Sequence, residues 1–226
     1  MKIQALLFMC NDFERAKFTL ENFAKYNPDI DIRVINSGGN SPRKHLQHIE
    51  QIVEFLDTED LWHRKTWCGR GGFGLKYIDL LFKYGLDKRY THTLYLETDV
   101  LTNGKITKEP KHDLSGVFVG CGQHERFLWN YMKIPDNHYH TGCGGTIFSY
   151  NFFDKIYNDK SKFSLFSDLY ERFPEHYYID LMITLIARVS DVTCGHWEEV
   201  SDVRGSMVNG KPYRNTSATL LHGHKV

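Results

Sequence analysis

Two carboxylates at the end of an apolar segment are the side chains of this sequence best placed to do chemistry. Glu97 and Asp99, with Thr98 between them, follow the apolar run 94–96. Residues two apart in an extended chain point to the same side, so both carboxylates can face one cation. Mg²⁺ and Mn²⁺ prefer oxygen ligands, and substrate phosphates commonly complete such sites. The triplet therefore predicts a divalent-metal site, and its alternative is an ordinary acidic turn after a strand.

The end of the sequence carries a second group of reactive side chains. His222, Gly223, His224 and Lys225 follow an apolar pair at 220–221. An imidazole can complete a divalent-metal site, and the Lys225 ammonium can neutralise a diphosphate leaving group. The alternative is a disordered tail, which is common at chain ends. The presence of the acidic triplet elsewhere in the chain favours the metal-site interpretation.

Strand-like and helix-like segments alternate along the chain, and this alternation predicts an α/β fold. Apolar segments with the length of strands lie at 3–9, 30–35, 91–96, 116–120 and 146–149. Apolar residues recur at helical spacing in 12–26, 46–56, 73–84 and a long segment that opens near Pro174. Ligand sites in open α/β sheets lie outside the carboxyl ends of strands. Glu97 and Asp99 occupy such a position.

The composition excludes several classes of protein. Hydrophobic residues make up 41% and aromatic residues 14% of the 226 positions, which fits an ordered globular protein. The 28 basic and 28 acidic residues balance, and this balance argues against nucleic acid as the main partner. Five scattered cysteines without a C-x-x-C pair favour a reducing compartment.

The apolar segments are too short to cross a membrane, since a spanning helix needs roughly 18 consecutive apolar residues. The run 3–9 contains Gln4 and lacks a small-residue cleavage site, so it favours a buried first strand over a signal peptide. We therefore expect a cytoplasmic protein with no integral membrane segment. The sequence shows no repeat or linker, which predicts one domain over residues 1–226.

The order of these features resembles the glycosyltransferases of the GT-A fold, which take their sugar from a nucleotide-diphosphate sugar. In that family the end of the first strand and the loop after the second bind the nucleoside. The matching residues here are Met9, Cys10 and Asn11, then Asn36, Ser37 and Gly38. The resemblance implies a Rossmann-like α/β domain with a mixed, mostly parallel sheet flanked by helices. Its nucleotide-sugar half would span about 1–104, and its acceptor half about 105–226.

The same resemblance implies a metal site. Glu97-Thr98-Asp99 resembles the family's aspartate-any-aspartate motif, with Glu in place of the first Asp. Asp99 would bind Mn²⁺ or Mg²⁺ directly, and Glu97 would lie nearer the ribose or a metal-bound water. Some members of the family also end with a His on the metal and a Lys on the diphosphate. His222 and Lys225 match these types at a compressed spacing.

A glycine-rich segment precedes the helix expected at 73–84. GT-A enzymes often place such a turn and a basic residue beside the diphosphate, and a helix N-terminus favours anions in any case. Arg70 and Lys76 are the candidates here. Glycines 69, 71 and 74 also match G-x-G-x-x-G, but that dinucleotide fingerprint requires an apolar strand immediately before it. Residues 59–67 are charged and rich in Trp, so the dehydrogenase interpretation is weak.

An inverting transferase needs a general base for the acceptor hydroxyl. The family commonly places an acidic residue near a helix start, which makes Asp180 the first candidate and Glu175 the second. The alternatives are helix capping for Glu175 and a solvated face or a buried pair for Asp180. A retaining enzyme would need no such base. Aromatic residues such as Trp129 and Tyr131 could stack on a carbohydrate or glycoconjugate acceptor, or could belong to the core.

Other interpretations of the same residues remain open. Backbone near Gly142 to Gly145 could approach a sugar closely, because glycine leaves room. A zinc half-site of His138, His140 and Cys143 could be completed by Cys194 or His196, although structural zinc ligands are usually more tightly paired. The carboxylates could instead serve a metal-dependent phosphohydrolase or nucleotidyltransferase. A sugar- or nucleotide-binding module without catalysis is the third possibility.

Overall fold

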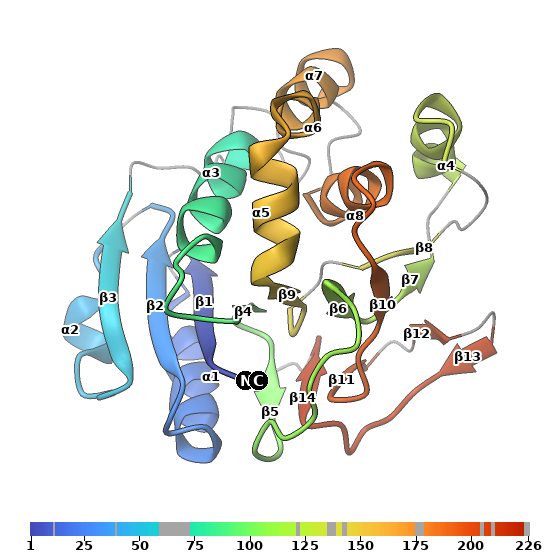
Figure 1. Ribbon diagram of the computed structural model, residues 1–226. Helices are drawn as coiled ribbons and strands as arrows, with labels where there is room; N and C mark the ends of the chain where they lie inside the picture. The colour runs from blue at the N-terminus through green and yellow to red at the C-terminus, as the bar shows by residue number, and fades with distance from the viewer. Residues whose placement is uncertain are drawn as a thin grey trace.

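A mostly parallel sheet forms the centre of the computed structural model (Figure 1). The structure describes residues 1–10, 12–38, 40–58, 73–120, 123–134, 139–141, 144–174, 179–203, 206–208 and 211–223. Within these residues the sheet has seven strands in the order β10-β6-β9-β4-β1-β2-β3. The strands are β1 (Ile3–Met9), β2 (Asp31–Asn36), β3 (Ile52–Asp57), β4 (His92–Leu96), β6 (Leu114–Gly116), β9 (Ile147–Ser149) and β10 (Cys194–His196).

Most neighbouring strands of this sheet run in the same direction. β1 pairs in parallel with β2 and β4, β2 with β3, and β6 with β10. β9 runs antiparallel to both β4 and β6. The carboxyl ends of β1, β2, β3 and β4 therefore meet at one edge, which is where α/β folds bind ligands.

Helices cover both faces of the sheet. They are α1 (Phe13–Tyr26), α2 (Arg43–Leu46), α3 (Phe73–Gly85), α4 (Gln123–Tyr131), α5 (Tyr150–Asn158), α6 (Lys160–Phe163), α7 (Leu165–Arg172) and α8 (Ile179–Val189). Leu6 and Phe8 of β1 pack in the core cluster of α3, α5, α7 and α8, while Ala5 and Leu7 pack in the cluster of α1. Side chains alternate between the two faces of a strand, so all seven residues of β1 are buried.

A second, smaller sheet joins the end of the chain to the segment after β4. Its strands are β5 (Leu101–Thr102), β11 (Val200–Asp202) and β14 (Leu220–His222), in the order β11-β14-β5. β14 runs antiparallel to β5 and parallel to β11. Two short pairs lie outside both sheets, β7 (Val119–Gly120) with β8 (Tyr139–His140), and β12 (Ser206–Val208) with β13 (Lys211–Tyr213).

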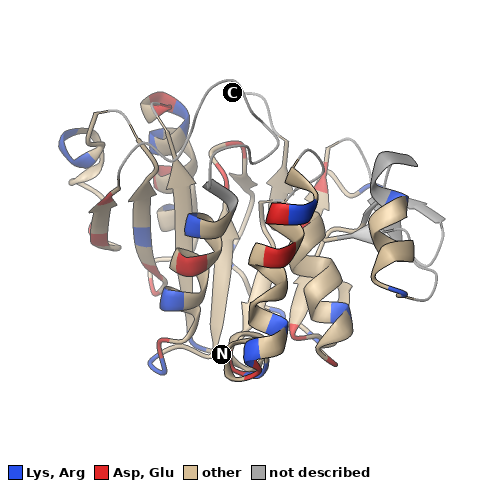
Figure 2. Cartoon of the chain, turned by 90° about the horizontal axis from the view of Figure 1, so that it is seen from above, with Lys and Arg blue, Asp and Glu red and all other residues tan. Residues whose placement is uncertain are grey.

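The predicted α/β class is confirmed, and the seven-stranded sheet is consistent with a Rossmann-like fold. The strand predicted at 3–9 is β1, and the helix predicted at 73–84 is α3 with one more residue. The long helix expected from Pro174 is described as α8, beginning at Ile179. Among the described residues, no helix is both long and apolar enough to span a membrane. Basic and acidic residues are interspersed over the helices (Figure 2).

The helix predicted at 46–56 is wrong. α2 ends at Leu46, and Ile52–Asp57 forms β3, which pairs with β2 as the edge strand of the sheet. The apolar residues of this segment fit both a helical period and a strand, and pairing with β2 decides between them. The single strand predicted at 116–120 is also two strands, because the chain leaves β6 after Gly116 and β7 pairs with β8 instead.

Candidate metal centre

The turn after β4 presents Glu97 and Asp99 at the carboxyl edge of the sheet. β4 lies beside β1, with Leu96 opposite Leu7, and the strand ends there. The amide of Val100 donates to the carbonyl of Glu97 at 3.2 Å and closes the turn. The Thr19 hydroxyl of α1 donates to the carbonyl of Thr98 at 2.8 Å, which ties the turn to the helix beneath it. Both carboxylates are consequently held half-buried, 31% and 32% exposed.

The C-terminal strand β14 brings His222 against these carboxylates. Its Nε2 lies 2.8 Å from Oε2 of Glu97 and 3.5 Å from Oδ1 of Asp99. The imidazole is 6% exposed, so its position is set by packing as well as by these contacts. The antiparallel pairing of Leu221 with Leu101 of β5 places the end of β14 beside the turn. Residues 97, 99 and 222 are hereafter called the acidic–histidine cluster.

The donor set of the acidic–histidine cluster fits a divalent cation. One ligand atom from each of Glu97, Asp99 and His222 lies within 4.8 Å of the others. Metal–oxygen bonds of about 2.1 Å place two ligands of one ion about 3 to 4 Å apart, so small side-chain rotations suffice. Two carboxylates and one imidazole suit Mn²⁺ or Mg²⁺ with water or phosphate in the remaining positions.

Polar groups around the cluster keep the carboxylate of Glu97 ionised. Burial by itself raises the pKa of Glu97, but hydrogen bonds from His222, from the Tyr95 hydroxyl and from the Gly144 amide outweigh burial. The pKa of Glu97 is therefore below its usual value. Tyr95 donates to Oε1 of Glu97 at 2.8 Å, and Nδ1 of His222 lies 2.7 Å from Oδ2 of the buried Asp202.

Gly144 packs directly on the cluster. A Cβ atom at this position would lie 2.6 Å from Cγ2 of Val100, 3.0 Å from Cβ of Glu97 and 3.1 Å from Cδ2 of His222. A methyl group here would force Val100 to shift and would press on Glu97 and His222, so glycine allows the close approach of the backbone. The small residues at 142–145 thus include one that contacts the proposed metal ligands.

Comparison with protein families and curated proteins assigns this cluster no role. Neither a known protein-family model nor a curated protein matches the chain.

The residues expected to bind the nucleoside lie at the same edge of the sheet. Met9 ends β1, and its carbonyl accepts from both the amide and the hydroxyl of Ser37 at 2.7 Å. Asn36 is buried and donates to Oδ1 of Asp57 at 3.0 Å. Gly38 has φ 145°, a conformation that favours glycine, and Cys10 is half-buried. These contacts bring the ends of β1, β2 and β3 together as one surface.

Thr98 and Lys76 are also described. The hydroxyl of Thr98 donates to Oδ2 of Asp12 at the start of α1, at 3.4 Å. Lys76 is exposed in the first turns of α3. The remaining predicted ligand residues, Asn11, Arg70 and Lys225, lie outside the described residues.

Asp180 lies near the aromatic residues that support Glu97. It is half-buried in the first turn of α8. Burial, followed by the negative charges of Asp180 and Glu97, raises the pKa of Tyr77 well above its usual value. The same two carboxylates act on Tyr95, whose ring centroid is 5.7 Å from that of Tyr77. The charges of Asp180 and Glu97 thus both act on one aromatic pair, while Glu175 lies outside the described residues.

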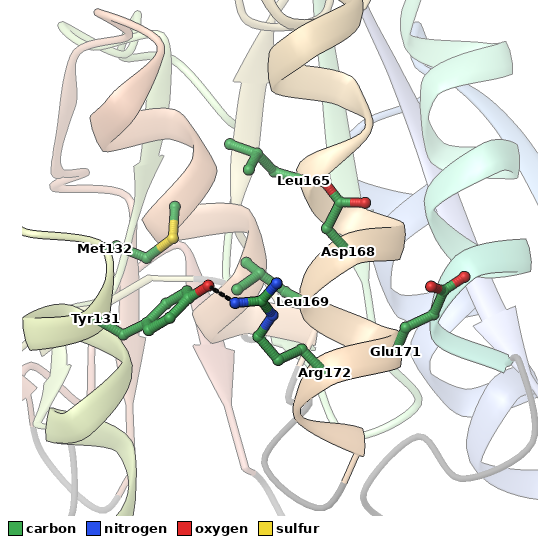
Figure 3. A pocket seen from close by; sticks show the side chains of 7 residues that line it. All are labelled: Tyr131, Met132, Leu165, Asp168, Leu169, Glu171 and Arg172. Carbon is green, nitrogen blue, oxygen red and sulfur yellow. Dashed lines mark hydrogen bonds between the residues drawn. The ribbon is translucent and has the colours of Figure 1, made fainter.

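A surface pocket lies between α4 and α7, and it is formed by other residues than the cluster (Figure 3). Its volume is about 470 Å³, and its lining residues are Tyr131, Met132, Leu165, Asp168, Leu169, Glu171 and Arg172. The Tyr131 ring is 45% exposed, and its hydroxyl accepts from Nη1 of Arg172 at 2.5 Å. Trp129, expected on the acceptor side or in the core, is 1% exposed and belongs to the core.

The zinc alternative falls largely outside the described residues, which exclude His138 and Cys143. Within the described part of the chain, the group with metal-ligand geometry is the acidic–histidine cluster, and it includes neither Cys194 nor His196. Burial raises the pKa of the Cys194 thiol to about 11.

Sequence reasoning missed Tyr95 and Asp202, and it considered the glycines around Gly144 for a sugar contact alone. Tyr95 had a usable signal, because it lies two residues before Glu97 on an extended strand and therefore points to the same side. Asp202 had none in its local sequence. It reaches the cluster only because β11 pairs with β14 in a register that puts Asp202 opposite His222.

Proposed function

We propose that this chain is a metal-dependent glycosyltransferase of the GT-A type, which moves a sugar from a nucleotide-diphosphate sugar to an acceptor hydroxyl. The observation that carries the proposal is the meeting of His222 with Glu97 and Asp99, whose ligand atoms lie within 4.8 Å of one another. These residues come from the end of a central strand and from the C-terminal strand. Their position at the carboxyl edge of a mostly parallel sheet is where such folds bind nucleotides.

Glu97, Asp99 and His222 would hold Mn²⁺ or Mg²⁺. The ion would supply positive charge that stabilises the diphosphate as it departs. The Tyr95 hydroxyl and the Gly144 amide keep Glu97 ionised and oriented for this role. Lys76, with Arg70 and Lys225, is assigned to the diphosphate on charge and on position in the sequence.

The nucleoside would lie over the joined ends of β1 and β2. Ser37 fastens the loop after β2 to the carbonyl of Met9. Cys10, which is half-buried beside this junction, would offer backbone to a base or ribose. These loops and the cluster flank the same carboxyl edge, so one extended donor can reach both.

Asp180 is assigned as the general base of an inverting reaction. Its carboxylate would take the proton of the acceptor hydroxyl as that oxygen forms a bond to C1 of the sugar. The bond between C1 and the diphosphate oxygen breaks at the same time, and the nucleoside diphosphate leaves with the electron pair. The support for Asp180 is that its charge, like that of Glu97, acts on both Tyr77 and Tyr95.

The acceptor is assigned to the side of α4 and α7. An exposed tyrosine ring, such as that of Tyr131, can stack on the apolar C–H face of a sugar. Arg172, Asp168 and Glu171 line the same pocket and supply hydrogen-bonding groups for hydroxyls. A carbohydrate or glycoconjugate acceptor fits this combination of an aromatic plane and charged side chains.

Thermal unfolding with a panel of nucleoside diphosphates and nucleotide sugars tests the proposal. A ligand that binds only the folded chain raises Tm by mass action. We expect one nucleoside diphosphate to raise Tm with Mn²⁺ and to lose that effect in chelator. No shift with any member of the panel would contradict the donor site.

Product analysis then separates the transferase from its alternatives. Incubation of the matching nucleotide sugar with Mn²⁺ and acceptor should release the nucleoside diphosphate and a glycosylated acceptor. Release of sugar phosphate would indicate a phosphohydrolase, and transfer of a nucleotidyl group would indicate a nucleotidyltransferase. Metal-dependent binding without turnover would indicate a binding module.

A further inference from the structure

We propose that Asp202 is a positioning residue for the metal ligand His222. Its carboxylate accepts from Nδ1–H and so orients the imidazole with Nε2 toward Glu97 and Asp99, where a bound ion would take the Nε2 lone pair in place of the hydrogen bond to Glu97. This inference rests on the metal centre of the proposed function. It adds a residue that acts on the metal through another side chain.

The contact between Asp202 and His222 is set by the backbone. β11 and β14 run parallel with Asp202 opposite His222, so both side chains project from the same face of the small sheet. The amide of Val203 donates to the carbonyl of His222 at 3.0 Å and continues the pairing beyond the two residues. Oδ2 of Asp202 consequently meets Nδ1 of His222 at 2.7 Å.

Both side chains of this contact are buried. Asp202 is 1% exposed and His222 is 5% exposed. A buried carboxylate is costly unless it is paired and hydrogen-bonded, and Nδ1 of the imidazole is one partner that the structure brings to it. With Nδ1 bonded to Asp202, the ring presents Nε2 to the two carboxylates of the cluster.

Such an arrangement has a known effect on metal sites. A carboxylate bonded to the far nitrogen of a ligating histidine fixes the tautomer and the ring orientation, and raises the basicity of the ligand. Removing this partner typically weakens metal binding 10- to 100-fold. Asp202 has the position and the burial that this role requires.

A purely structural role makes a different prediction. Asp202, His222 and Glu97 could merely fasten β14 to the end of β4, and a variant would then lose stability without a specific change in metal affinity. Glu199 provides the matched control. It is also buried, at 4% exposed, and accepts from the amides of Thr107 and Lys108 at 2.8 and 2.7 Å and from the Thr219 hydroxyl. None of these partners belongs to the acidic–histidine cluster.

Mn²⁺ binding by the full chain tests the inference without any substrate. The paramagnetic resonance signal of free Mn²⁺ would be titrated at constant pH with the unmodified chain, Asp202→Ala, Asp202→Asn and Glu199→Gln. Circular dichroism and thermal unfolding check that each variant is folded. We expect Asp202→Ala to raise the Kd for Mn²⁺ by 10- to 100-fold and Glu199→Gln to lower Tm while leaving that Kd within twofold.

The tautomer itself is read by nitrogen NMR of histidine-labelled chain loaded with Mg²⁺, with His222→Gln used to assign the signal. We expect a proton on Nδ1 of His222 in the unmodified chain and loss of this single tautomer in Asp202→Ala. If Asp202→Ala is unfolded, Asp202→Asn decides by the same two measurements. A Kd within twofold of the unmodified chain overturns the positioning role alone, whereas an unmodified chain that binds no Mn²⁺ overturns the metal centre itself.

Discussion

Nε2 of His222 lies 2.8 Å from Oε2 of Glu97, across 125 positions of sequence. The contact joins the strand that ends the described chain to the turn after a central strand of the main sheet. Its consequence is a cluster of two carboxylates and an imidazole at the edge where four parallel strands end. The predictions below follow from that cluster and from the groups that hold it.

Replacement of Asp99 tests the metal ligands directly. Asp99→Ala removes one of the three donor atoms, so we expect Mn²⁺ affinity to fall by at least about 10-fold and metal-dependent donor binding to be lost. The fold should remain intact, because Asp99 is about one-third exposed. Calorimetric titration with Mn²⁺ gives the affinity, and Asp79→Ala on the exposed face of α3 is the control. Unchanged donor affinity in the presence of Mn²⁺ would contradict the assignment of the site.

Gly144→Ala tests the close packing of the backbone against the cluster. The added methyl group would meet Val100, Glu97 and His222 at 2.6 to 3.1 Å. Overpacking of this kind costs about 1–3 kcal/mol, and the displaced side chains should also bind Mn²⁺ more weakly. Gly104→Ala is the matched control, because nothing lies within 4 Å of its added Cβ. Urea unfolding gives the free energies, and equal effects at the two positions would refute the packing argument.

The stability contributed by Glu199 should depend on pH. Burial raises the pKa of Glu199, but hydrogen bonds from Thr219, Thr107 and Lys108 outweigh burial and lower it below its usual value. The unfolded chain then binds more protons than the folded chain at acid pH, so this stabilisation is present above the ordinary carboxyl pKa and is lost as the pH falls. Urea unfolding of the unmodified chain and Glu199→Gln from pH 7 to pH 3 should show their difference shrinking below about pH 4.5. A difference that does not change with pH would show that Glu199 is not held as an ionised group.

Tyr131 tests the acceptor side. Tyr131→Ala removes an exposed ring from the pocket between α4 and α7, and we expect the acceptor KM to rise about 3- to 10-fold. Donor binding with Mn²⁺ should be unchanged, because the cluster uses other residues. Tyr131→Phe keeps the ring and should have a smaller effect, and Tyr157→Ala removes a similarly exposed ring from α5 as the control. Steady-state kinetics with varied acceptor concentration measure this KM. An equal rise in KM for Tyr157→Ala would contradict the assignment of Tyr131 to the acceptor site.

The sequence predicted those helices and strands whose own residues determine their structure. β1 is a short apolar run bounded by polar residues, and α3 has a continuous apolar face, so each follows from its own residues. The segment 46–56 was not decidable in this way. Its apolar spacing satisfies a helix and a strand equally, and only the neighbouring β2 makes Ile52–Asp57 a strand.

The candidate site likewise has one part that the sequence predicts and another that it does not. Glu97 and Asp99 lie two residues apart at the end of a strand, so their types and spacing alone indicated a cation-binding site. Asp202 and Gly144 enter the site through strand register and close packing, which join residues far apart in the chain. Helices and strands pack against the neighbours that bury their apolar faces. The local sequence around a residue does not indicate which neighbours these will be. The sequence therefore determined which groups could bind a metal, and the tertiary structure decided which groups surround and orient them.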